Sequence, residues 1–162
     1  MMVDSEKFER LSILSKQFNQ ECDALNSTIE EWNKRLEALS LGQEVWLILE
    51  SEEYYTDSED EDYDGPIKHC DEVCLGHAKV DNRWQLAVKE RSYTLEKNTR
   101  GWDTWVEDRE QFTKTRLLSV SRERRIQAID RPDDLFSALE KEVTQGLEKV
   151  AKAQKLAKLD NA

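Results

Sequence analysis

A heptad pattern of apolar residues across residues 4–39 constrains this chain more than any other feature. The pattern predicts one long helix that starts at Asp4 or Ser5 and ends by the Leu41-Gly42 step. Its positions alternate steps of three and four, with Ser15 filling one of them: Phe8, Leu11, Phe18, Cys22, Leu25, Ile29, Trp32, Leu36 and Leu39. A lone helix with such a stripe must bury it, so the sequence predicts a partner for it.

That partner is either another helix of the same chain or a second copy of the protein. Ser15 and Cys22 weaken a parallel two-stranded coiled coil, and Phe and Trp side chains are bulky for one. These residues favour mixed packing, with contacts inside the chain and a homodimer face. The interaction residues that we predict from this helix are Phe18, Leu25, Ile29 and Trp32.

The C-terminal part also has helical spacing, which Pro132 interrupts. We expect a short helix at about residues 119–130 and a long one at about 132–158, with one apolar stripe on the second. The stripe consists of Leu135, Leu139, Val143, Leu147, Val150 and Leu156. In this interpretation the kinked C-terminal helices pack against the first helix.

Residues 44–50, 72–80 and 83–93 read as three strands of an antiparallel meander. Asp81-Asn82 suits a tight hairpin turn, because both residue types tolerate positive φ. A two-residue turn pairs Val80 with Arg83 and places five side chains on one face: Leu75, His77, Trp84, Leu86 and Val88. A three-residue loop, the second choice, turns His77 outward.

Residues 94–116 read as an irregular polar stretch that contains Trp102 and Trp105. These two tryptophans either cover the sheet as a lid, which we favour, or form an exposed binding site. The complete pattern predicts a single α+β domain over residues 1–162: a long N-terminal helix, a three-stranded antiparallel meander and kinked C-terminal helices.

The negative charge is concentrated in one stretch. The chain has a formal net charge of −11, and residues 51–64 hold eight acids with no Lys or Arg. Without these eight, 27 acids face 24 basic residues. This balance argues against a nucleic-acid or membrane partner. We interpret residues 51–71 as an acidic flexible loop.

Part of that loop spells a calcium-binding pattern. Asp60, Asp62 and Asp64 fill the first ligand positions, Gly65 the sharp turn, and Asp71 the twelfth position. Asp71 is short for a position that is normally Glu, Lys68 adds positive charge, and the neighbours are strands. A solvated loop is therefore the favoured reading, calcium binding by Asp60, Asp62, Asp64 and Asp71 is the alternative, and phosphorylation near Ser58 is a third.

Both histidines and two of the three cysteines fall within nine residues, at His69, Cys70, Cys74 and His77. Zinc accepts such ligands, but structural sites usually join two separated pairs. A Cys–His nucleophile pair is a weaker idea, because neighbours on one strand rarely reach the needed geometry. The odd cysteine count favours free thiols in a reducing compartment.

The chain contains no phosphate-binding glycine motif and no metalloprotease motif. We therefore expect a non-catalytic, cytoplasmic interaction or assembly protein without a cofactor, self-associating as a homodimer and open to protein partners. A calcium-responsive module and an acidic inhibitor that mimics nucleic acid are the alternatives. The order of elements is similar to the general layout of prefoldin subunits, although Pro132 departs from it.

Overall fold

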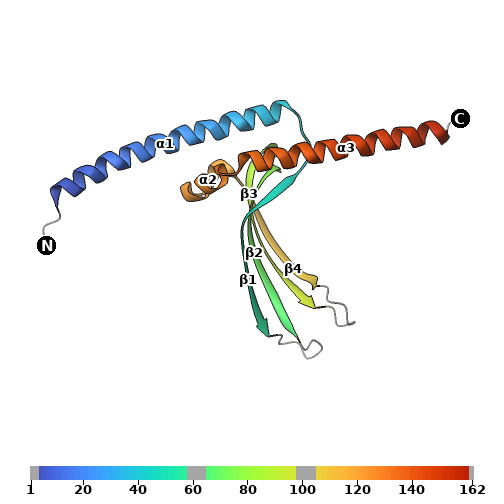
Figure 1. Ribbon diagram of the computed structural model, residues 1–162, viewed down its shortest axis with the longest axis horizontal. Coiled ribbons are helices and arrows are strands. Elements are labelled where there is room, and N and C mark those ends of the chain that lie inside the picture. The colour runs from blue at the N-terminus through green and yellow to red at the C-terminus, as the bar shows by residue number, and fades with distance from the viewer. Residues whose placement is uncertain (1–3, 58–64, 98–104, 161–162) are drawn as a thin grey trace.

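The computed structural model describes residues 4–57, 65–97 and 105–160. The chain runs α1 (Ser5–Ala38), β1 (Val45–Asp57), β2 (Pro66–Val80), β3 (Arg83–Lys97), β4 (Trp105–Arg116), a 3₁₀ turn (Leu117–Ser119), α2 (Arg122–Ile129) and α3 (Pro132–Asp160). The four strands form one long antiparallel sheet, which projects from the helices as an arm (Figure 1). The predicted α+β class is confirmed.

Helix α1 begins and ends close to the predicted points. The Asp4 carboxylate accepts a hydrogen bond from the Glu6 backbone N–H at 3.2 Å, which satisfies one of the free donors of the first turn. At the other end Ser40 has a φ of 52°, which turns the chain out of the helix toward β1. The second boundary at Pro132 is also confirmed, because α3 starts there.

The sheet has four strands in the order β1-β2-β3-β4, so the prediction of three strands was wrong. The missed strand, β4, lies within the stretch that we expected to be irregular. Strands β1 and β2 also extend far into the stretch 51–71 that was interpreted as a flexible loop, to Asp57 and from Pro66. Residues 58–64 of that loop lie outside the described residues.

The hairpin between β2 and β3 has the predicted two-residue turn. Asp81 and Asn82 have φ values of 51° and 63°, the combination that matches the twist of paired strands. Val80 pairs with Arg83, and the register runs without a shift to Ile67 and Glu96. His77 is consequently on the face that contacts the helices, where it is fully buried.

The core lies where the base of the sheet meets the helices. Val45, Leu75, Leu86 and Val88 cover one face of the sheet. Onto this face pack residues of α1, the 3₁₀ turn, α2 and α3: Ile29, Leu36, Leu117, Ala128, Leu135 and Leu139. A side-chain hydrogen bond links the layers, because the Leu86 N–H donates to Asn33 Oδ1 at 2.8 Å.

We had expected the two long helices to pack side by side, but they do not do so over their lengths. They meet near one end of each, where Trp32 and Phe136 contact edge to face with ring centroids 5.7 Å apart. From there α1 extends toward one end of the molecule and α3 toward the other (Figure 1). The β1 segment and the sheet base take up the space that a helical hairpin would have filled, and Arg131 at the start of α3 donates to the Ile48 carbonyl.

Candidate functional site

The free half of α1 carries the first candidate surface. All side chains of residues 4–21 are exposed, including Phe8, Leu11, Leu14 and Phe18. The same heptad stripe is buried further on, at Cys22, Ile29 and Leu36. The stripe therefore starts outside the core and runs into it, and its outer half covers nothing in the described structure except an Arg122 guanidinium 5.1 Å from the Phe18 ring.

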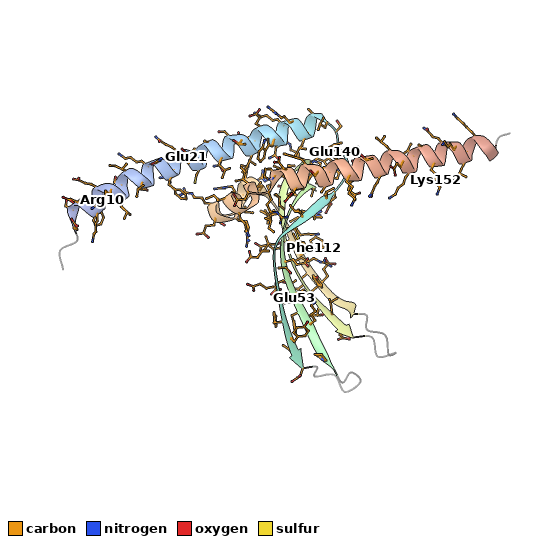
Figure 2. The ribbon with its side chains drawn as sticks, viewed as in Figure 1. Arg10, Glu21, Glu53, Phe112, Glu140 and Lys152 are labelled. Atoms are coloured by element: carbon orange, nitrogen blue, oxygen red, sulfur yellow. The ribbon has the colours of Figure 1, made fainter. Side chains whose placement is uncertain are left out.

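The free half of α3 has a second exposed stripe. All side chains of residues 147–158 are exposed; Leu147 and Val150 share one side of the helix, whereas Leu156 lies on the opposite side from Leu147. Four lysines and one glutamate lie in the same segment. Figure 2 shows that Arg10 and Glu21 lie on α1 toward one end of the molecule and that Lys152 lies on α3 toward the other end. The two stripes thus have no means of covering one another within one chain.

An apolar groove with a volume of about 470 Å³ lies between these stripes, where α1 and α3 meet. Its walls are mostly aliphatic and aromatic, with a few polar side chains along the margin: Trp32, Arg35, Leu36, Leu39, Leu41, Phe136, Leu139, Glu140, Val143 and Thr144. Leu39 is largely exposed at its edge. The groove connects the buried parts of both helices to their exposed parts.

A polar cluster occupies the face of the sheet that points away from the helices. Tyr93 donates to Glu72 Oε1 at 2.8 Å, and the Arg91 guanidinium lies 4.1 Å from the Tyr93 ring centroid. Arg91 also pairs with Glu72 at 3.7 Å and Glu110 at 2.7 Å. Burial and the neighbouring Glu72 carboxylate raise the pKa of the Tyr93 phenol. The hydrogen-bond donors and acceptors of this cluster pair with one another. The cluster therefore joins β2, β3 and β4.

On the helix side of the sheet, beyond the core, lies a hollow of about 260 Å³ with carboxylates in its wall. Arg124 of α2 closes one side and pairs with Glu50 at 2.8 Å. The hydrogen bond from Arg124 lowers the pKa of Glu50. Arg124, one of the three arginines in the sequence RERR, therefore contacts an acid of β1.

Only one of the four predicted calcium ligands, Asp71, lies within the described residues. Asp60, Asp62 and Asp64 lie outside them. Asp71 lies within β2, where it pairs with Glu52 and Ser92. It is five extended residues, or about 17 Å, from Pro66, whose carbonyl is the seventh-position ligand of the pattern. Pro66 and Asp71 cannot share one ion at that separation, so Asp71 does not complete a twelve-residue loop.

The four Cys and His residues of β2 lie on two faces of the sheet. Cys70 and Cys74 are buried on the face away from the helices, whereas His69 and His77 are on the helix side. His77 Nδ1 donates to the Gln43 carbonyl at 3.0 Å, and His69 stacks on Tyr54 at 4.5 Å. They therefore do not surround one point. Across the parts of the chain that the structure describes, no three His, Cys, Asp or Glu side chains are grouped to hold a metal ion.

The predicted interaction residues divide into buried and exposed ones. Ile29 is fully buried, and Leu25 and Trp32 are partly buried against the core, so these three hold the chain's own fold. Phe18 stays about half exposed. Trp102 lies outside the described residues, and Trp105 is the first residue of β4.

Comparisons with known proteins found no relative of this chain. No family model matches the chain, and no match was found among curated proteins or solved structures. Among the described residues, no helix is both long and apolar enough to cross a membrane.

Proposed function

We propose that this protein is a non-catalytic assembly protein that self-associates through the free halves of its two long helices. The observation that carries the proposal is the apolar stripe of α1, which continues past the core for residues 5–21 and stays exposed in the part of the chain that the structure describes. An isolated amphipathic helix of that length is marginal in water, so burial against a second copy would stabilise it.

The apolar content of both free segments supports the same conclusion. Phe8, Leu11 and Phe18 on α1 and Leu147 and Val150 on α3 leave large side chains in water at helical spacing. Single exposed apolar residues are ordinary, but stripes of this kind mark interaction surfaces. The long sheet arm takes no part in either stripe, so it stays available to other protein partners in the assembly.

The test is the subunit count of the intact protein, together with one pair of matched variants. Leu11 lies on the stripe, whereas Ile13 lies on the opposite side of the helix, and both are 66% exposed in the single chain. Leu11→Ala removes one buried side chain from each of two subunits, so it should weaken dimerisation by about 3 kcal/mol, or about 100-fold in Kd.

Ile13→Ala should leave the Kd unchanged, because this side chain stays in water in either state. Native mass spectrometry and sedimentation over a dilution series give the subunit count and the Kd. A wild-type protein that is a monomer at high concentration contradicts the proposal. Equal increases in Kd for the two variants would also contradict the proposal. The weaker dimerisation would then depend on the number of exposed apolar side chains and not on their position along the stripe.

A further inference from the structure

We infer that the dimer is formed in trans by the free half of α1 from one copy lying antiparallel on the free half of α3 from the other. This inference rests on the proposed self-association and names its geometry. The helical hairpin that is absent within one chain would then be formed twice between two chains, once at each end of the dimer.

The directions of the helices carry the first step. The two free segments leave the body at opposite ends of the molecule and run in nearly the same direction along it (Figure 1). A two-fold rotation that places a second α1 over the first copy's α3 reverses the direction of that α1, so the pair is antiparallel. The same rotation places the first α1 on the second α3, which covers both stripes in one closed interface.

Self-pairing of like helices is the alternative. A two-fold axis perpendicular to a free helix pairs only that helix with its copy, so α1–α1 and α3–α3 contacts of this kind would join two different neighbours and continue as a filament. Pairing only α1 with α1 would leave Leu147 and Val150 in water. A two-fold axis parallel to the helices would close a dimer with both like pairs, but it places the lysine-rich α3 segments side by side with parallel dipoles, so the exchanged arrangement is the favoured closed dimer.

Charge and length agree with the exchanged pairing. The α3 segment 144–158 has four lysines and one glutamate, so two such segments would repel one another. The α1 segment 5–21 has three acids and three basic residues, so it has no net charge, and pairing it with α3 avoids the repulsion between two lysine-rich segments. The segments 5–21 and 144–160 are equal in length, about 25 Å each. Opposed helix dipoles favour the antiparallel pairing.

The groove between Trp32 and Val143 is where the interface would cross from the free half of α1 to the free half of α3. Its apolar wall lies between the two stripes, so a second copy spanning both stripes also passes over it. The largely exposed Leu39 at the groove edge would then be covered. No ligand other than the second chain is needed to fill this groove.

Cysteine cross-linking between two different variants tests the geometry directly. An alignment of residue 5 with residue 160 places Ser12 opposite Ala153, and both side chains are small and exposed. Ser12→Cys and Ala153→Cys proteins are made separately, mixed, allowed to exchange subunits, and treated with a short bismaleimide. The three native cysteines are buried, and the wild-type protein gives the background reaction.

The cross-linked dimer should form in the mixture and be absent from either variant alone. Ser51→Cys on β1, mixed with Ser12→Cys, is the control and should give no product. Native mass spectrometry of the same samples reports the subunit count. A dimer in which Ser12→Cys links to itself refutes the exchanged geometry but leaves self-association standing. A monomer refutes both.

Discussion

Gly76 lies beneath the indole of Trp46, and replacing it by alanine should damage the base of the sheet. The two residues are cross-strand partners in β1 and β2. A Cβ atom at position 76 would lie 2.7 Å from Trp46 Cδ2 and closer still to Trp46 Cε3 and the Val45 carbonyl oxygen. The carbonyl belongs to a buried residue paired with His77, so only the indole has room to move.

Moving that indole breaks the contacts that hold it. Trp46 Nε1 donates to Glu44 at 2.7 Å, and the Lys89 ammonium lies 4.7 Å from the ring centroid. Inserting a methyl group into a filled site costs about 1–3 kcal/mol, and the lost contacts of the indole add to that. We expect Gly76→Ala to lower the free energy of unfolding by about 3 kcal/mol, a large part of the usual 5–15 kcal/mol.

Urea unfolding followed by far-UV circular dichroism measures this change without relying on tryptophan emission. Gly42→Ala is the matched control, since nothing lies within 4 Å of its added Cβ. Adding Trp46→Ala to Gly76→Ala should recover only part of the loss, because the Val45 carbonyl remains. A Gly76→Ala protein within about 0.5 kcal/mol of wild type would refute the reasoning.

Two further perturbations test contacts of the sheet. Asn33→Ala leaves the buried Leu86 N–H without an acceptor, so we expect a loss of about 1–3 kcal/mol in urea unfolding, and an Asn33→Asp variant that keeps an acceptor should lose less. Burial raises the pKa of Tyr93, and so does the Glu72 carboxylate. The neutral phenol therefore stabilises the fold fully below about pH 10, where unfolded tyrosine ionises, and this contribution is lost as the pH rises further. The urea midpoint should fall more steeply above that pH in wild type than in Tyr93→Phe, and parallel curves would count against the assignment.

Local signals predicted much of the fold. The stripe of α1, the break at Pro132 and the turn at Asp81-Asn82 each depend on neighbouring residues, and each is where the sequence placed it. Such features are determined by the conformational preferences of residues that are close in sequence.

The missed parts depend on pairing between distant residues. Strand β4 is polar along most of its length, and it is a strand because its backbone pairs with β3, from Ala87 with Arg116 to Lys97 with Trp105. The acids of β1 likewise appear in extended backbone because β2 lies beside them, with Lys68 pairing to Glu53 at 2.9 Å. Composition alone favours a loop for such residues, since strand formation by polar sequences is decided by the neighbouring strand.

The candidate surfaces show the same division. The α1 stripe was visible in the sequence, but which half of it would be exposed depended on how the helices diverge. The cluster of Glu72, Arg91 and Tyr93 was missed, although a signal existed. Once the two-residue turn is fixed, the register of the hairpin pairs Glu72 with Arg91 and Cys70 with Tyr93 directly.

The position of β1 at the outer edge of the sheet has a consequence for solubility. An outer strand presents backbone donors and acceptors that a second chain can join, which is how many sheets aggregate. Here the exposed outer part of β1 includes Glu50, Glu52, Glu53 and Asp57. A second β1 added there would bring carboxylates against carboxylates. The acids thus act as gatekeepers that oppose fibril growth along the arm.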